Sequence, residues 1–151
     1  MRKKTIISIA IFFLIFLGIF IHPERVIYEA EIIGKVLDEK GIPIQGAKVS
    51  RIEEKQTKHK DGYYEYEEYI SETVLTDKNG QFTLEEKKRI EWIHYPFSLP
   101  YVWCYADFEV FKENYKIYRT EFNDYSEYNE KSIGCENITF SPTISLKKNN
   151  E

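Results

Sequence analysis

The side chains that most often carry catalysis are few and scattered in this chain. Its three histidines lie far apart in the sequence, at His22, His59 and His94. No two of them have the spacing of metal ligands on one helix face, and the zinc-peptidase pattern H-E-x-x-H is absent. No serine lies in the sequence context of a nucleophile elbow. The sequence therefore predicts a protein that is not an enzyme and that needs no metal and no cofactor.

Two cysteines, Cys104 and Cys135, could do redox, metal or structural chemistry. The chain has no C-x-x-C motif, and two thiols alone rarely complete a zinc site. In an oxidising compartment an isolated pair most simply forms a disulfide. The chain-entropy model assigns roughly 3.5 kcal/mol to a bridge of this loop length. We therefore predict a disulfide between Cys104 and Cys135 in an exported protein.

Residues 1–22 differ in composition from the rest of the chain. Arg2, Lys3 and Lys4 precede Thr5–Ile21, a segment without any charge. In a helix this segment reaches about 25 Å, the low end for a bilayer core of about 30 Å. We expect an uncleaved, single-pass anchor in a bacterial inner membrane, with its basic end in the cytoplasm. A cleaved signal peptide, which would give a secreted protein, and a buried core helix are the alternatives.

The body of the chain is acidic. The whole chain has 21 Lys and Arg and 25 Asp and Glu, a net charge of −4 at pH 7, and three of the basic residues lie in the N-terminal segment. Binding to nucleic acid requires clustered cations that neutralise phosphates. Anionic lipid headgroups would repel an acidic surface. The charge therefore argues against both as partners of the body.

Hydrophobic residues recur with a period of two along the chain after residue 25, which predicts β-strands. Asp61-Gly62 is a two-residue turn signal that joins two of these strands as a hairpin. We expect an antiparallel meander over residues 28–86. Its strands are expected at Val26–Leu37, Ala47–Thr57, Tyr63–Leu75 and Gln81–Glu85.

The second half of the body shows the same pattern with longer interruptions. Glu85–Pro100 contains two prolines close together and is expected to be an ordered loop. Cys104 lies on the apolar side of the next strand and should point into the core. The expected elements are strands at Tyr101–Val110, Tyr115–Phe122 and Ile138–Leu146, and a polar loop at Asn123–Glu136. The pattern predicts an all-β fold, a single antiparallel sandwich of seven or eight strands over residues 26–148.

Two turn motifs resemble those of a known family. Gly41-x-Pro43-x-x-Gly46-Ala47-x-Val49 is followed by Thr76-Asp77-x-x-Gly80-x-Phe82. Both are similar to motifs of the carboxypeptidase regulatory-like domains, which are small sandwiches of transthyretin-like topology. The likeness covers roughly residues 30–86 and implies a binding or spacer module. The motif residues themselves are explained by turn geometry and packing.

Aromatic residues are abundant and form two candidate partner-binding groups. The first group combines tyrosines with acidic residues: Tyr63, Tyr64, Tyr66, Glu67, Glu68 and Tyr69. The second group is Trp92, Trp103 and Tyr105. Tyrosine offers contact area at low entropy cost, and carboxylates attract a basic partner. Strand propensity and cross-strand pairing explain the first group equally well, and capping of the sandwich explains the second.

These features predict a non-catalytic, exported protein that binds another protein in the cell envelope. A specific form of this hypothesis is a periplasmic immunity protein that neutralises an incoming toxin. A module that binds a glycan or small ligand through the region of Trp92 and Trp103 is an alternative. A structural domain of a larger surface assembly is another, and it predicts an unpaired edge strand.

Overall fold

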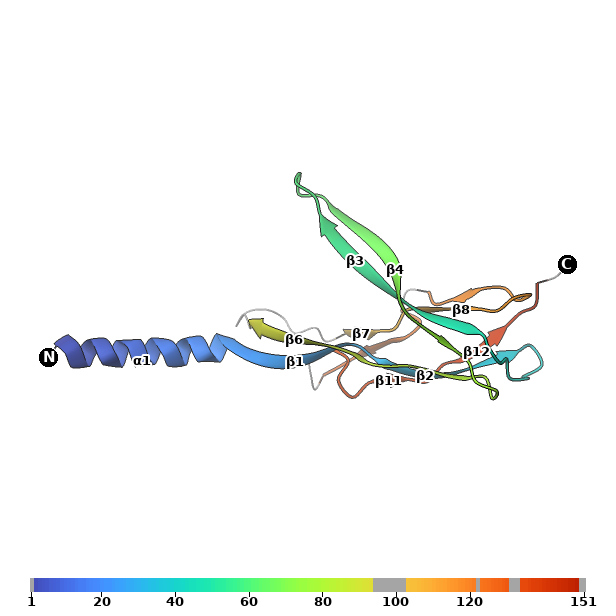
Figure 1. Ribbon diagram of the computed structural model, residues 1–151, viewed down its shortest axis with the longest axis horizontal. Coiled ribbons are helices and arrows are strands. Elements are labelled where there is room, and N and C mark those ends of the chain that lie inside the picture. The colour runs from blue at the N-terminus through green and yellow to red at the C-terminus, as the bar shows by residue number, and fades with distance from the viewer. Residues whose placement is uncertain (1, 94–102, 122, 131–133, 150–151) are drawn as a thin grey trace.

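The computed structural model describes residues 2–93, 103–121, 123–130 and 134–149. In this part of the chain one helix is followed by strands, so the molecule is mostly β-sheet, in agreement with the predicted all-β class (Figure 1). The elements are α1 (Arg2–Phe20), β1 (Ile21–Glu29), β2 (Glu31–Asp38), β3 (Lys48–Lys58), β4 (Tyr64–Leu75), β5 (Gln81–Leu84), β6 (Lys87–Ile93), β7 (Trp103–Tyr105), β8 (Phe108–Phe111), β9 (Tyr118–Arg119), β10 (Ser126–Tyr128), β11 (Thr139–Phe140) and β12 (Thr143–Leu146).

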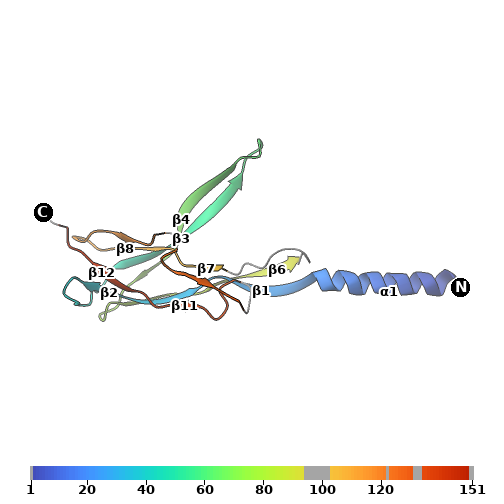
Figure 2. The same ribbon diagram turned by 180° about the vertical axis from the view of Figure 1, so that it is seen from behind.

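Helix α1 extends from one end of the sandwich and continues directly into β1 (Figures 1 and 2). A transmembrane helix was expected over Thr5–Ile21. No helix in the described ranges meets the length and apolarity that a membrane crossing requires, so this prediction is not supported.

Two four-stranded sheets form the layers of the sandwich. In the first sheet β2 is central, with β5 antiparallel to it and with β11 and β12 parallel to it. The second sheet has the order β4-β3-β8-β9 and is antiparallel throughout. Two shorter ribbons, β1–β6 and β7–β10, complete the fold at the end where α1 joins.

The core lies between the two four-stranded sheets. Burial alternates along β2, β5, β8 and β12, as the period of two predicted. Each sheet turns its apolar positions toward the other sheet, because this removes them from water. The buried core residues are Ile32, Val36, Ile44, Ala47, Val49, Phe82, Leu84, Ala106, Phe108, Val110, Ile144 and Leu146.

The two turn motifs lie side by side, and the backbone N–H of Ala47 in the first donates to Oγ1 of Thr76 in the second at 2.9 Å. Oδ1 of Asp38 accepts hydrogen bonds from the backbone N–H groups of Lys40 and Ile42, both at 2.8 Å. Oδ1 of Asp77 does the same for the turn that ends at Gly80. Gly80 has a φ of 74°, and a Cβ there would lie 2.4 Å from the backbone oxygen of Val36. These residues therefore serve turn and packing geometry, as expected.

The predicted disulfide is present. Cys104 and Cys135 are bonded, with 5.0 Å between their Cα atoms, and both are buried. They pack with Ala30 and Ile138 in a small second core. The backbone N–H of Cys135 also donates to the carbonyl oxygen of Ile27 at 2.7 Å. The bridge thereby fixes the end of the Asn123–Glu136 region against β7 and β1.

The number and arrangement of strands differ from the prediction. Twelve strands are present in the described ranges, rather than seven or eight. The expected strand Val26–Leu37 is broken at the fully buried Ala30, where β1 leaves the sandwich to pair with β6. The expected strand Tyr101–Val110 is broken after Tyr105, because Ala106 and Asp107 bond to other segments. Of that strand, residues 101 and 102 lie outside the described ranges.

The expected meander is also wrong, and so is the expected all-antiparallel pairing. Strand β3 does not pair with β2, since the chain crosses to the other layer between Gly41 and Gly46. Strand β5 then returns to β2. The expected loop Glu85–Pro100 contains β6, while its residues 94–100 lie outside the described ranges. The β1–β6 ribbon is largely exposed, so it shows little of the alternation that marks a half-buried strand.

Candidate functional site

The outer half of the β3–β4 hairpin projects from the sandwich as an arm (Figures 1 and 2). We call residues 52–70 the arm. Strand β3 pairs with β8 only over Lys48–Arg51, and its last bond on that side runs from Ile52 N to the oxygen of Asp107 at 2.9 Å. Beyond Ile52 the described residues pair β3 with β4 alone. The arm therefore has solvent on both faces for most of its length.

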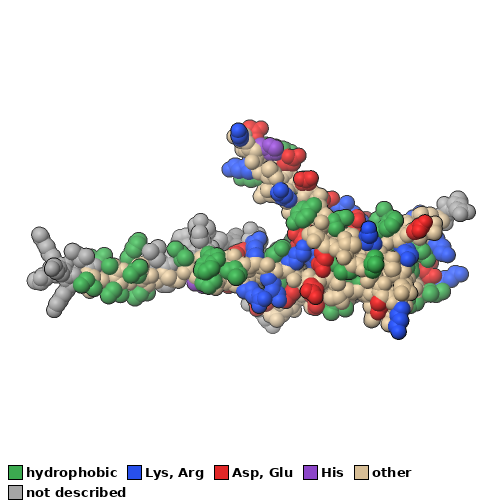
Figure 3. Space-filling view, viewed as in Figure 1, with side chains coloured by type: hydrophobic (Ala, Val, Ile, Leu, Met, Phe, Trp, Pro, Cys, Tyr) green, Lys and Arg blue, Asp and Glu red, His purple; other side chains and the backbone are tan. Residues whose placement is uncertain are grey.

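The tip of the arm turns at Asp61-Gly62 as predicted, but the loop is longer than the two residues expected, since the N–H of Gly62 donates to the oxygen of His59 at 3.0 Å. The N–H of His59 donates to the oxygen of Tyr63 at 2.8 Å, and Gly62 takes a φ of 86°. A left-handed φ suits glycine, which explains the Asp61-Gly62 signal in the sequence. The ring of His59 also lies 2.8 Å from a carboxylate oxygen of Glu65. The space-filling view shows charged side chains reaching the tip (Figure 3).

The strand register divides the first predicted partner-binding group between two faces of the arm. Tyr64, Tyr66 and Glu68 lie opposite Lys58, Gln56 and Glu54 on one face. Successive residues of a strand point to opposite faces, so the other members of the group face the other way. These members are Glu67 and Tyr69, whereas Tyr63 precedes β4 in the turn, with its ring centre 5.8 Å from that of His59.

The tyrosines of the arm are exposed and are held by polar cross-strand contacts. Tyr66 is 62% exposed, and its hydroxyl accepts a hydrogen bond from Gln56 at 2.7 Å. Tyr69 donates to Glu53 at 2.7 Å, and this bond raises the pKa of the Tyr69 hydroxyl. The Nζ atom of Lys58 lies 5.5 Å from the ring centre of Tyr64. The rings are thus positioned without being buried.

Arg51 anchors the root of the arm in the sandwich. Its side chain is fully buried and donates to Glu29 at 3.1 Å, to the oxygen of Ala30 at 3.0 Å and to the oxygen of Glu85 at 2.8 Å. A second carboxylate, Glu72, lies 3.6 Å from its Nε. A buried cation is retained only where such partners compensate the loss of water. These contacts tie β3 to β1, β4 and the β5–β6 connection.

Burial changes the protonation of the anion at this root. It raises the pKa of Glu29 to about 7, and the nearby Glu53 also acts in this direction, while Arg51 acts against it. For Glu53 burial also works to raise the pKa, but hydrogen bonds, first of all from Lys87, bring it below its usual range. Two neighbouring carboxylates therefore titrate in different pH ranges.

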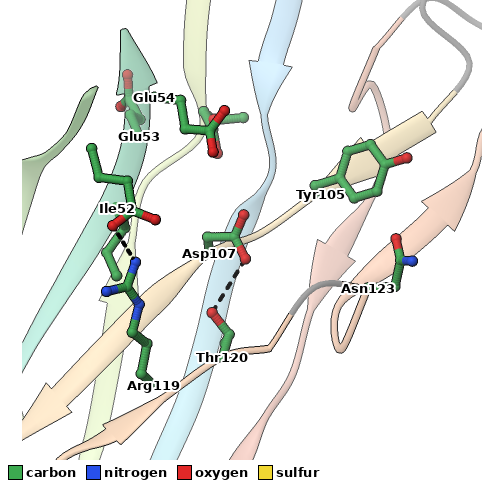
Figure 4. A pocket seen from close by; sticks show the side chains of 10 residues that line it. Ile52, Glu53, Glu54, Tyr105, Asp107, Arg119, Thr120 and Asn123 are labelled. Carbon is green, nitrogen blue, oxygen red and sulfur yellow. Dashed lines mark hydrogen bonds and ion pairs between the residues drawn. The ribbon is translucent and has the colours of Figure 1, made fainter. Parts of the chain in front are cut away.

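An acidic groove lies where the arm leaves the sandwich (Figure 4). Its volume is about 470 Å³. Two of its walls come from the arm and from residues at the end of β7 and at or after the end of β9. The residues that line it are Glu29, Ile52, Glu53, Glu54, Glu68, Tyr105, Asp107, Arg119, Thr120 and Asn123.

The charges in the groove are unevenly compensated. Arg119 lies 2.5 Å from Glu68, and Thr120 donates to Asp107 at 3.2 Å. Burial raises the pKa of Asp107. Glu54 stands directly opposite Glu68 in the hairpin, and no basic side chain in the described ranges pairs with it. Like charges at facing positions repel, so the groove attracts a cation. No group of three or more metal-binding side chains in the described part of the chain is placed to hold a metal ion.

The second predicted group is only partly brought together. Trp103 and Tyr105 lie on β7 with ring centres 6.3 Å apart, and Tyr128 of β10 packs on Trp103 at 5.3 Å. Trp103 is 51% exposed. Trp92 is 58% exposed but lies on β6. Tyr105 also lines the acidic groove, so it connects the two groups.

Several residues of this region were not predicted from the sequence. Arg51 shares its strand parity with the buried Val49, and a cation at a core position was a usable signal. Glu29, Asp107 and Arg119 gave no such signal. They come from three separate segments and meet at the groove only in the folded chain.

Comparisons with known proteins give no family for this chain. No protein-family model matches it, and no curated protein matches it. Among solved structures it is similar to 3-chlorocatechol 1,2-dioxygenase from Rhodococcus opacus 1CP, with a TM-score of 0.42 and 15% identity, over 85% of this chain and 61% of that one. It is similar also to the group B streptococcus pilus 2b backbone protein, with a TM-score of 0.36 and 13% identity, over 81% and 42%. The chain thus spans less than two thirds of either protein.

Proposed function

We propose that this chain is a non-catalytic protein-binding module that works outside the cytosol and holds its partner with the arm. The observation that carries the proposal is a hairpin that stands clear of the sandwich and exposes four tyrosines. The tyrosines are Tyr63, Tyr64, Tyr66 and Tyr69, with exposed fractions between 43% and 63%. Rigid aromatic side chains of this kind dominate the binding energy of protein interfaces.

Charge defines the kind of partner. Residues 52–70 contain six carboxylates and three lysines. An acidic surface steers a basic protein toward it and disfavours acidic ones. The disulfide between Cys104 and Cys135 supports a site of action outside the cytosol, because such bridges persist in oxidising compartments.

The proposal also includes a more specific fold for the sandwich, which the two turn motifs support. Gly41 and Gly80 both have a positive φ, and their turns lie in the two motifs that resemble the carboxypeptidase regulatory-like pattern. We propose a transthyretin-like sandwich of that kind, used as a scaffold for the arm. A periplasmic immunity protein against a basic toxin is the specific form of this function.

The test is site-specific crosslinking from the arm. A photoreactive amino acid is placed at Tyr66 and, as a matched control, at Ile117, which is 62% exposed on the body. The same crosslinked protein should appear with the probe at Tyr66 and be absent with the probe at Ile117. The immunity form further predicts that the wild-type chain protects cells from a toxin encoded beside it and that Glu68→Lys does not. Equal crosslinking from both positions would contradict the proposal.

A second candidate function is saccharide binding by the exposed aromatic residues of β6, β7 and β10. The exposure of Trp92 and Trp103 favours it, since burial of both would have removed it. Flat exposed rings stack on the apolar faces of sugars as they do on other rings. Titration with neutral oligosaccharides, followed by tryptophan fluorescence, tests this function. A spectrum that stays unchanged at millimolar sugar contradicts it.

A further inference from the structure

The open edge of β3 is the feature from which a specific mode of binding follows. Strand β8 lies beside β3 only up to Arg51, and the bond from Ile52 to Asp107 is the last on that side. Beyond it, in the described part of the chain, no strand pairs with this edge of β3. A strand edge of this kind is a template on which another extended chain can pair.

The register shows which backbone groups the edge offers. His59 is hydrogen-bonded to Tyr63 across the hairpin, and bonded pairs alternate with non-bonded pairs along antiparallel strands. Thr57, Lys55 and Glu53 therefore direct their backbone groups at β4. The N–H and C=O groups of the alternate residues Glu54, Gln56 and Lys58 point to the open edge. The bond of Ile52 toward β8 follows the same alternation.

The groove at the foot of this edge selects the partner. A strand added in line with β8 would begin beside Asp107 and Tyr105 and then run past Glu54. Glu54 and Glu68 face each other there, and Arg119 compensates only Glu68. Cationic side chains of an added strand would relieve this repulsion.

We propose that the open edge of β3 receives an extended segment of another protein, with Lys or Arg at alternate positions, as an added strand in line with β8. This inference rests on the proposed function of the arm and specifies how the partner is held. Backbone bonds to Glu54, Gln56 and Lys58 supply binding, and the acidic groove supplies selectivity.

A second copy of this chain is the competing occupant of the same edge. Antiparallel pairing of two β3 edges centred on Gln56 would set Glu54 of one copy opposite Lys58 of the other. Self-association of the chain alone through this edge, measured by sedimentation, would therefore overturn the inference. The facing Glu54 and Glu68 at the foot of the arm favour a cationic segment of another protein instead.

The experiment uses the full chain and synthetic peptides as probes. The first peptide alternates lysine and valine over seven residues with blocked ends, and the second replaces lysine with glutamate. Two further lysine–valine peptides carry N-methyl groups, one on its valines and the other on its lysines. N-methylation removes hydrogen-bond donors and leaves the charge unchanged. Binding is measured by titration, and amide hydrogen exchange is read at Gln56 and Lys58.

We expect the lysine–valine peptide to bind, the glutamate peptide not to bind, and exchange at Gln56 and Lys58 to slow. Only one set of amides in an added strand faces β3, so one of the methylated peptides should lose about tenfold or more in affinity and the other should keep it. Glu54→Lys should weaken binding by a similar factor. Glu39→Lys, at an exposed site in a distant turn, should not.

The inference is overturned if both methylated peptides bind as well as the unmodified one, or if exchange at Gln56 and Lys58 does not change. Those results would leave an acidic arm that binds by charge alone, so the proposed function would survive. Absence of any binding by the lysine–valine peptide would also overturn the inference. The proposed function fails separately, if crosslinking from Tyr66 finds no partner specific to the arm.

Discussion

The two halves of the β3–β4 hairpin lie in different environments. In the inner half Val49 is fully buried, and β3 is covered by β4 on one edge and by β8 on the other. In the outer half the tyrosines are exposed and only cross-strand contacts join the strands. Isolated two-stranded hairpins are marginally stable in water, so the arm owes its conformation to the inner half and to Arg51. A segment that adds little to stability is free to vary for binding.

The largest loss of stability is expected when Arg51, at the root of the arm, is replaced. Arg51→Ala should lower the free energy of unfolding by about 3–5 kcal/mol, because it empties a fully buried site and leaves Glu29 and the carbonyl oxygens of Ala30 and Glu85 without their donor. The matched control is Arg119→Ala, which breaks an exposed ion pair with Glu68 and should cost about 1 kcal/mol or less. Chemical denaturation measures both. Equal losses of stability in the two variants would mean that the burial of Arg51 does not make its ion pair more important than the exposed one.

Removal of the disulfide tests the body alone. Cys104→Ala with Cys135→Ala should lower the free energy of unfolding by about 2–4 kcal/mol. Thermal unfolding under oxidising and reducing conditions measures this, and reduction of the wild-type chain should give a similar shift. Peptide binding at the arm should persist at temperatures where the variant is folded, because the bridge lies outside the arm. A loss of binding in the folded variant would show that the two regions are coupled.

The free energy of unfolding should depend on pH because of Glu29, which lies at the root of the arm. The pKa of Glu29 is raised to about 7 from 4.5, so the folded state keeps a proton that the unfolded state has lost. Stability should therefore fall as pH rises from about 4.5 to 7, by up to about 3 kcal/mol, and then level off. Glu29→Gln should flatten this part of the profile, measured by denaturation between pH 4.5 and 8.

Glu53 should change the free energy of unfolding in the opposite direction, and at lower pH. Its pKa is lowered in the folded state, so its contribution is lost as pH falls below about 4.5. The two effects therefore occupy separate pH ranges. A wild-type profile that rises between pH 4.5 and 7 would contradict the raised pKa of Glu29.

The smallest effect on stability is expected on the arm itself. Tyr66→Ala removes an exposed ring and one hydrogen bond and should change the free energy of unfolding by about 0.5 kcal/mol or less. Val49→Ala in the inner half of the same hairpin should cost clearly more, because it leaves a cavity. If Tyr66→Ala is as costly as Val49→Ala, the arm contributes to the core after all.

Local signals in the sequence predicted much of the sandwich. The hairpin, the glycine turns, the inward direction of Cys104 and the disulfide all depend on neighbouring residues or on an isolated cysteine pair. The sequence also pointed to the tyrosines of the arm, although it could not divide them between two faces. Breaks at Ala30 and after Tyr105 were missed, because the bonds that cause them come from distant segments.

The sequence by itself determined an all-β body, its hairpin and its cysteine bridge, because period-two burial and turn chemistry are local properties of a chain and because its two cysteines allow a single pairing. Only the tertiary structure decided that β8 ends beside Arg51, that β11 and β12 run parallel to β2, and that Glu29, Asp107 and Arg119 meet at one groove. These features depend on which segments pair across the molecule, and pairing between segments far apart in sequence is set by the fit of the whole core rather than by any local pattern.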